Sequence, residues 1–193
     1  MNAELSGARP PARLSVVIAV RDEAENIAPL VEELDAALLP LGYELIFVDD
    51  GSSDGTDREL ATAAATRPHM VVITHERSCG KSAGVATGAW AARGDLLLLL
   101  DGDGQNNPHY LPDMVRLLDA AGPAAGMVQG ERQGRQDTNF KRFQSRLANA
   151  VRRSLLRDGT RDTGCGLQVV RRDVYLRLPR FDALHRFTPA LGA

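Results

Sequence analysis

The chain has 193 residues, enough for one domain with a substantial core, and its 44% hydrophobic and 25% charged residues are ordinary for a soluble globular protein. Its formal charge of −2 is unevenly distributed: residues 1–131 hold 9 Lys/Arg and 20 Asp/Glu, whereas residues 132–193 hold 14 and 5. The acidic part suits a bound cation and the arginine-rich part suits an anionic partner, and we expect no nucleic-acid partner.

Several other classes of protein are excluded by what the sequence lacks. Cys79 and Cys165 belong to no CxxC motif and to no His/Cys cluster with zinc spacing, so we expect free thiols in a reducing, cytoplasmic compartment. Residues 1–12 have neither the basic start nor the apolar stretch of a signal peptide and are expected to form a flexible tail. The leucine run at 96–100 is far shorter than the roughly 20 residues of a membrane-spanning helix.

Predicted strands and helices alternate along the chain. Apolar and β-branched runs predict the strands, and apolar residues at helical spacing predict the helices between them. We expect strands at 14–20, 43–50, 70–76, 96–101 and 127–132, and helices at 25–38, 56–65, 81–92, 108–121 and 139–157. This order predicts an α/β fold with a mostly parallel central sheet flanked by helices. Ligands of such sheets bind beyond the carboxyl ends of the strands, which makes the loops after Val20, Val48, Ile73 and Leu100 informative.

The starts of the first two helices carry capping residues. Asn26 can cap the first helix, which would place Pro29 in the first turn, where proline is tolerated. In the turn before the second helix, Ser52, Ser53 and Asp54 are all good capping residues.

The segment LLLLLDGDGQNNP runs from a buried strand directly into two carboxylates. Asp101 ends the strand, Asp103 follows after one glycine, and Gln105 lies two residues further on. Mg²⁺ and Mn²⁺ prefer oxygen ligands and usually bind through one or two carboxylates plus substrate phosphates. The pattern therefore favours a divalent metal site at the sheet edge, and a solvated acidic turn is the alternative.

A second acidic loop, VDDGSSDGT, follows the second strand. Asp49 and Asp50 can accept hydrogen bonds from a nucleotide base or ribose, while the rest of the loop caps a helix. Two common nucleotide motifs are absent. GKS at 80–82 lacks the preceding glycine of a P-loop, because that position is His75, and RDEAEN replaces the dinucleotide-binding glycines after the first strand.

The basic segment at 139–157 has helical periodicity. Phe140, Phe143, Leu147, Ala150 and Val151 would share one face. A stripe of arginines lies roughly a quarter turn away and consists of Arg142, Arg146, Arg153 and Arg157. Such a helix can lie at a membrane surface or bind a lipid phosphate, because arginine binds phosphate in a bidentate way. An ordinary surface helix is the alternative.

Four segments together resemble an inverting family 2 glycosyltransferase with the GT-A fold. They are AVRDEAEN (19–26), VDDGSSDGT (48–56), CGKSAGVATGAWAARGD (79–95) and DGDGQNNP (101–108), and the likeness extends along nearly all of 14–132. The segments at 130–149 and 162–191 are similar to the branch that loads sugars onto polyprenyl phosphates, namely dolichol-phosphate mannosyltransferases and their undecaprenyl-phosphate relatives.

The resemblance implies one GT-A domain at 13–193 after the tail. Residues 13–131 would form the nucleotide-sugar and metal half, and 132–193 the basic acceptor half. Members of this branch usually continue past HRFTPAL, so we expect an acceptor half that is shortened at its C-terminus.

The resemblance also implies roles for individual residues. Asp101, Asp103 and Gln105 match a metal motif that holds Mg²⁺ or Mn²⁺ against the donor diphosphate. The expected donor contacts are Ala19, Arg21, Glu23, Val48, Asp49, Asp50, Lys81, Asp101 and Gly102, where Ala19 and Arg21 replace the Pro and Tyr or Asn that the family often has. The expected acceptor-phosphate contacts are Lys141, Arg142, Ser145 and Arg146, with His185 and Arg186 as possible additions, and the expected catalytic residues are Asp103, Arg132 and Asp162. A solvated Lys81, a turn-forming Asp162 and a structural His185 are the alternatives.

The activity that this resemblance implies is transfer of a hexose, with inversion, from a GDP-mannose or UDP-glucose type donor to a polyprenyl phosphate at the cytoplasmic face of a membrane. A phosphate acceptor is already anionic and needs little general base, whereas a hydroxyl acceptor needs one, for which Asp162 is the first candidate. Two alternatives stay open: a family 2 transferase with a saccharide or other hydroxyl acceptor, and a non-catalytic nucleotide-sugar-binding or membrane-docking module. The sequence does not predict an oligomeric state.

Overall fold

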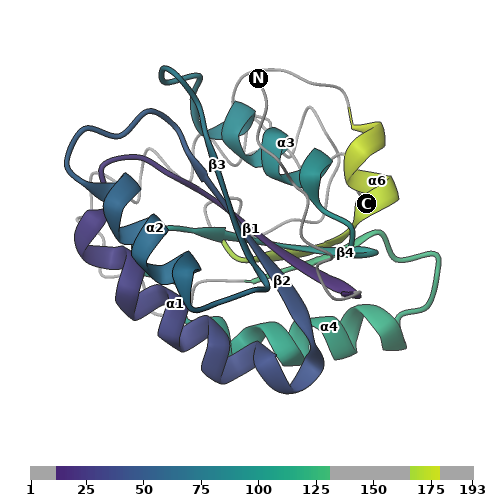
Figure 1. Ribbon diagram of the computed structural model, residues 1–193. Coiled ribbons are helices and arrows are strands. Elements are labelled where there is room, and N and C mark those ends of the chain that lie inside the picture. Colours follow the sequence, from purple (N-terminus) through teal and green to yellow (C-terminus); the bar gives the residue numbers. More distant parts are fainter. Residues whose placement is uncertain (1–11, 131–165, 179–193) are drawn as a thin grey trace, which may run out of the picture.

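The computed structural model describes residues 12–130 and 166–178, and in it one central sheet lies between two layers of helices (Figure 1). The strands are β1 (Leu14–Val20), β2 (Tyr43–Asp49), β3 (Met70–Thr74), β4 (Leu96–Asp101), β5 (Met127–Gln129) and β6 (Gln168–Arg171). The α-helices are α1 (Ala24–Leu38), α2 (Thr56–Ala65), α3 (Lys81–Ala91), α4 (Leu111–Ala120) and α6 (Arg172–Arg177), and short 3-10 helices span Leu39–Leu41 and Pro108–Tyr110. The helix predicted at 139–157 lies outside the described residues.

The sheet confirms the predicted α/β class and its mostly parallel character. Its strand order is β3-β2-β1-β4-β6-β5. The pairs β1 with β2, β1 with β4, and β2 with β3 are parallel, and β6 runs antiparallel to both β4 and β5. Strand β6 was not predicted from the sequence. It is only four residues long, and its place between β4 and β5 depends on pairing with residues distant in the chain.

The core has two parts because successive strand residues point to opposite faces of the sheet. Val16 and Ile18 belong to the cluster formed with α1, α2 and α4, whereas Val17 belongs to the cluster formed with α3 and α6. Figure 1 shows the same division, with α1, α2 and α4 below the sheet and α3 and α6 above it. The leucine run of β4 contributes to both parts, which confirms a strand buried on both faces.

The start of α1 differs from the prediction. The residue before the helix is Glu23, and Asn26 lies inside the first turn, where its side-chain amide donates to the Glu23 carboxylate at 2.5 Å. The backbone N–H of Ala24 instead donates to Asp54 Oδ2 at 3.1 Å, so the neighbouring loop satisfies it. The prediction of Asn26 as the cap is therefore wrong, and Pro29 lies in the second turn.

Helix α2 is preceded by Gly55, in a left-handed conformation with φ of 103°. Asp54 Oδ1 accepts from the N–H of Thr56 at 2.9 Å, which confirms Asp54 as a residue that satisfies the helix start. Ser52 and Ser53 do not cap this helix; they donate to Asp49 and Asp22. Among the residues that the structure describes, no helix has both the length and the apolar character needed to cross a membrane.

Candidate functional site

A cavity of about 300 Å³ opens where several strands of the sheet end. Residue Ala19 of β1 lies opposite Val48 of β2 on one side and Asp101 of β4 on the other, so the loops after these strands meet at one edge. The cavity is lined by Ala19, Val20, Arg21, Glu23, Asp50, Ser78, Gly80, Lys81, Asp101, Gly102 and Asp103. The cavity therefore lies where the parallel topology predicts a ligand site.

Asp50 follows β2 and is almost completely buried, with 3% of its surface exposed. Both of its oxygens accept two hydrogen bonds each: Oδ1 from His75 Nδ1 and the N–H of Cys79, and Oδ2 from the Ser78 hydroxyl and the N–H of Gly80, at 2.7 to 2.8 Å. Burial on its own would raise the pKa of Asp50, but these donors outweigh it and lower the pKa to about 2. The carboxylate is therefore ionised at neutral pH.

These hydrogen bonds fix the loop between β3 and α3 against the end of β2. A Cβ atom at Gly51, whose φ is 75°, would lie 2.9 Å from the backbone nitrogen of Ser78, so a side chain there would push the two loops apart. Arg21 reaches the same loop from β1 by donating from Nη1 to the Ser78 hydroxyl at 3.0 Å. Asp50 thus orders one wall of the cavity as well as facing it.

Asp101 and Asp103 form an acidic wall of the cavity. The ammonium group of Lys81, the first residue of α3, forms an ion pair with the Asp101 carboxylate. The backbone N–H of Gln105 donates to Asp103 Oδ1 at 3.1 Å, but the Gln105 residue is exposed and does not line the cavity. Two carboxylates facing one space suit a hard cation such as Mg²⁺ or Mn²⁺, and the ion pair with Lys81 demonstrates that Asp101 accepts a positive partner there.

Gly166 packs directly against this wall. A Cβ atom at Gly166 would lie only 2.2 to 2.6 Å from the carboxylate atoms of Asp101, a separation that no side chain can accommodate without movement. Gly166, two residues before β6, is therefore placed beside the acidic wall.

The cavity brings together most, but not all, of the predicted donor and metal residues. Those that line it are Ala19, Arg21, Glu23, Asp50, Lys81, Asp101, Gly102 and Asp103. Val48 and Asp49 do not line it: Val48 is a core residue, and Asp49 is buried and accepts hydrogen bonds from Ser52. The predicted residues that lie outside the described part of the chain are Arg132, Lys141, Arg142, Ser145, Arg146, Asp162, Cys165, His185 and Arg186.

Some residues at the site were not predicted. Ser78 and Gly80 line the cavity, and His75 binds Asp50 without lining it. All three follow β3, so the rule that ligands lie beyond the carboxyl ends of parallel strands pointed to their loop. Their side-chain types alone gave no signal, because serine, glycine and histidine are common in ordinary loops.

The fold and the position of the cavity define a class of protein: this is the GT-A fold of nucleotide-sugar transferases. The structure superimposes with a TM-score of 0.70 on glucosyl-3-phosphoglycerate synthase from Mycobacterium tuberculosis, solved with Mn²⁺, UDP and glucosyl-3-phosphoglycerate, at 21% identity over 87% of this chain and 60% of that one. It superimposes with a TM-score of 0.66 on a mannosyltransferase from Pyrobaculum calidifontis, solved with GDP-Man and Mn²⁺, at 22% identity over 88% and 47% of the two chains.

The sequence narrows the class further. The model of the family described as Glycosyl transferase family 2 matches residues 15–178, and the chain belongs to that family. A similar curated protein is the undecaprenyl-phosphate 4-deoxy-4-formamido-L-arabinose transferase of Yersinia pestis (strain Pestoides F), which is 34% identical over 187 residues. The match covers 95% of this chain and 56% of that protein, so the chain spans about half the length of the curated relatives it matches.

Proposed function

We propose that the chain binds a nucleotide-diphosphate sugar in the cavity and transfers the sugar to a polyprenyl phosphate, with inversion and with help from a divalent cation. The observation that carries the donor part is the placement of Asp50, Lys81, Asp101 and Asp103 around one space at the strand ends. The acceptor part is supported by relatives whose names specify undecaprenyl phosphate. The basic residues of 132–193 would supply the acceptor half.

The donor sugar could be a hexose or a pentose derivative. The similar solved structures hold GDP-Man or UDP, which suits the proposed hexose donors of the GDP-mannose and UDP-glucose type. The name of the curated relative instead specifies 4-deoxy-4-formamido-L-arabinose, a five-carbon sugar. A nucleotide of that sugar therefore belongs in every binding test.

The residues of the cavity suggest how transfer would proceed. Asp101 and Asp103 would hold Mg²⁺ or Mn²⁺, which neutralises charge on the leaving diphosphate. Lys81 would exchange its ion pair with Asp101 for a contact to the same diphosphate. Because four donors already fill both oxygens of Asp50, a base or ribose must replace one of them, and the Ser78 hydroxyl is the partner that can rotate away.

The acceptor side needs orientation more than it needs a base. A phosphate monoester is anionic at neutral pH, so it can attack the anomeric carbon from the face opposite the leaving group without losing a proton in the step. Arg142 and Arg146 would position it, because a guanidinium group can bind two phosphate oxygens at once. Replacing these arginines should then lower the turnover with the lipid phosphate.

Calorimetric titration tests the donor site. The wild-type chain would be titrated with UDP-glucose, GDP-mannose and a 4-deoxy-4-formamido-L-arabinose nucleotide, each with Mn²⁺ and with EDTA. We expect one donor to bind only with metal and the Asp103→Ala variant to lose that binding. Asp113→Ala is the matched control, because it removes an exposed carboxylate on α4 that pairs with Arg116 instead. Binding that survives both EDTA and Asp103→Ala would refute the metal-assisted donor site.

A second experiment separates lipid phosphate from other acceptors. Sugar transfer to undecaprenyl phosphate and to a saccharide would be measured for wild type and for the double variant Arg142→Ala/Arg146→Ala. The proposal predicts lipid-linked product that falls at least about tenfold in the variant, with donor affinity unchanged. Arg58→Ala/Arg116→Ala, on α2 and α4, is the charge-matched control. Transfer to the saccharide alone would assign the chain to a hydroxyl-accepting transferase, and donor binding without transfer to either acceptor would favour a non-catalytic module.

A further inference from the structure

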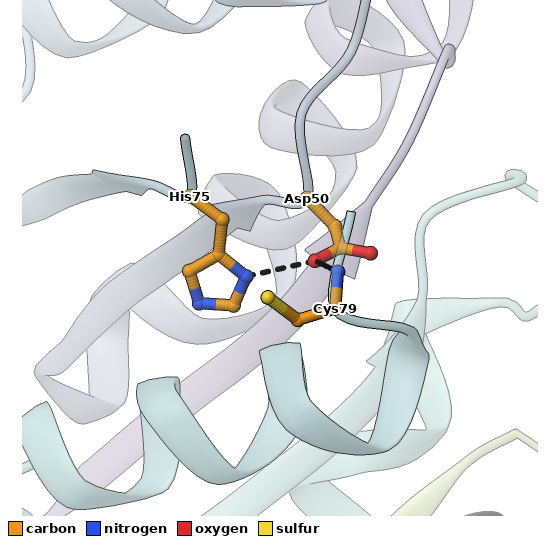
Figure 2. Close-up of side chains that lie close together, drawn as sticks. All are labelled: Asp50, His75 and Cys79. Atoms are coloured by element: carbon orange, nitrogen blue, oxygen red, sulfur yellow. Dashed lines mark hydrogen bonds and ion pairs between the residues drawn. The ribbon is translucent and has the colours of Figure 1, made fainter. Parts of the chain in front are cut away.

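Three side chains of different chemistry converge behind one wall of the cavity. The carboxylate of Asp50, the imidazole of His75 and the thiol of Cys79 each offer one ligand atom, and these atoms all lie within 4.8 Å of one another. They come from the loop after β2, the end of β3 and the loop before α3. Figure 2 shows the His75 ring hydrogen-bonded to the Asp50 carboxylate and the Cys79 sulfur turned towards that ring.

We propose that Asp50, His75 and Cys79 form a site for a thiophilic divalent cation of the Zn²⁺ type, and that this cation inhibits the protein by competing with the donor nucleotide for Asp50. Thiolate, imidazole and carboxylate are the protein ligands that Zn²⁺ takes. The pair Asp101 and Asp103 offers oxygen alone and suits Mg²⁺ or Mn²⁺. The two groups would therefore select different metals, although Asp50, Asp101 and Asp103 all line the same cavity.

The geometry requires only a small rearrangement. Zinc bonds of about 2.0 to 2.3 Å in a tetrahedron place the ligand atoms roughly 3.3 to 3.7 Å apart. Asp50 Oδ1 and His75 Nδ1 are 2.7 Å apart, so they must separate slightly, and the sulfur must approach them. Cys79 is an exposed free cysteine whose thiol donates to the carbonyl of Arg77 at 3.3 Å, a weak bond that its side chain can give up by rotating.

A fourth residue contacts the second ring nitrogen of His75. A cation can bind Nδ1 only when the ring proton is on Nε2, whereas at present Nδ1 donates its hydrogen to Asp50. The Thr87 hydroxyl of α3 lies 3.0 Å from Nε2; it can donate to Nε2 in the present tautomer and can accept from it once the proton has moved. Metal-bound histidines commonly hold their second nitrogen in this way. Binding would move one proton from Nδ1 to Nε2 and release the thiol proton of Cys79 to solvent.

The inhibitory part rests on the proposed function. Asp50 lines the donor cavity, and a cation bound to Oδ1 would remove the hydrogen bond from His75 and draw the carboxylate away from its present position. The metal and a nucleotide bound through Asp50 should then exclude each other.

Cobalt spectroscopy tests the site without any nucleotide. Co²⁺ replaces Zn²⁺ in such sites and gives an intense sulfur-to-metal absorption band when a thiolate binds it. We expect this band when Co²⁺ is added to the full chain, its disappearance when Zn²⁺ is added, and its loss in Cys79→Ser. Cys165→Ser is the control because it removes the chain's other thiol, and it should keep the band. Thr87→Val should weaken Zn²⁺ binding about tenfold or more.

A competition titration then tests inhibition. Donor affinity would be measured with Mg²⁺ present while Zn²⁺ is increased, and we expect it to fall at least about tenfold for wild type and not for Cys79→Ser. Absence of the cobalt band in folded wild-type protein, or a band that depends on Cys165 instead, would overturn the site. A cobalt band with undiminished donor affinity in Zn²⁺ would overturn the inhibitory role alone. If no donor binds at all, the proposed function fails while the spectroscopic result stands.

Discussion

At the scale of single residues, Asp50 is an example of a buried carboxylate kept ionised by its surroundings. Burial disfavours its charge, but two backbone N–H groups, a histidine and a hydroxyl lower its pKa below the ordinary value of 3.8. The same four bonds tie the loop before α3 to the end of β2. Asp50 therefore contributes both to the charge of the cavity and to the order of its wall.

Replacing Asp50 with asparagine tests this double role. The asparagine amide has only one acceptor oxygen, whereas four groups donate hydrogen bonds to the two oxygens of Asp50. We therefore expect Asp50→Asn to lower the free energy of unfolding at neutral pH by about 1–3 kcal/mol. The measurement is urea unfolding, with the exposed Asp57→Asn as control. An unchanged unfolding midpoint would contradict the role of Asp50 in ordering the loop.

The difference in unfolding free energy between wild type and Asp50→Asn should depend on pH in a defined direction. The pKa of Asp50 is about 2 in the folded protein and 3.8 in the reference state, so the unfolded chain binds the proton more tightly. Its stabilising contribution is complete above about pH 4 and is lost as the pH falls towards 2. The difference between wild type and Asp50→Asn should therefore shrink over this range in urea unfolding at several pH values. A constant difference would mean that the charge of Asp50 is not what stabilises the loop.

At the scale of elements, α3 approaches the sheet unusually closely because it carries glycine where it crosses β1. A Cβ atom at Gly88 would lie 2.4 Å from Val17 Cγ1 and 3.3 Å from Val48 Cγ2, both buried. Helical propensity alone favours alanine over glycine at this position by about 1 kcal/mol. Packing therefore predicts that Gly88→Ala destabilises the protein, whereas helical propensity predicts that it stabilises it.

We expect the packing effect to be larger than the propensity effect. Gly88→Ala should destabilise the protein by about 1–3 kcal/mol, because an extra methyl group in a filled core forces its neighbours to move. The cause can be isolated with Val17→Ala, which removes the atom that the new methyl group would meet. In urea unfolding the double variant should be more stable than the sum of the two single effects. Additive effects, or stabilisation by Gly88→Ala alone, would contradict the close approach.

The junction before β6 has a comparable contact at the site itself. Because a Cβ atom at Gly166 would collide with the Asp101 carboxylate, Gly166→Ala should displace that carboxylate. We expect affinity for Mn²⁺ in the presence of donor to fall about tenfold or more. Isothermal titration measures this affinity. Wild-type metal affinity in a folded Gly166→Ala protein would show that Asp101 does not need its observed position.

At the scale of the whole molecule, charge is divided along the chain. The excess of arginine in 132–193 and of carboxylates in 1–131 should orient the protein at an anionic surface, if the basic part meets lipid as proposed. We expect sedimentation with vesicles of anionic lipid, weakened several-fold as ionic strength rises through the physiological range. Neutral vesicles are the control. Equal binding to both vesicle types, or binding that salt does not affect, would contradict an electrostatic membrane contact.

Much of the architecture was predictable from local pattern. The strands at Leu14–Val20 and Leu96–Asp101 were predicted to the residue, because the first is a mostly apolar, β-branched run followed by Arg21 and the second is a leucine run that ends in an aspartate. The helix starts were harder to predict. Asn26 is a good capping residue by type, but Asp54 from another loop satisfies the first N–H group of α1. A contact between residues this far apart in the chain cannot be predicted from the residues next to the helix start.

The sequence alone determined the fold class and the acidic residues of the site, because strand periodicity and the carboxylates that follow Val48 and Leu100 are local features of the chain. Only the tertiary structure decided which groups meet there. It paired Asp50 with His75, placed Gly166 against Asp101, and buried Asp49 although its neighbour faces the cavity. Side-chain direction alternates along a strand and loops approach one another through contacts distant in sequence, so adjacent aspartates of the same type have different environments.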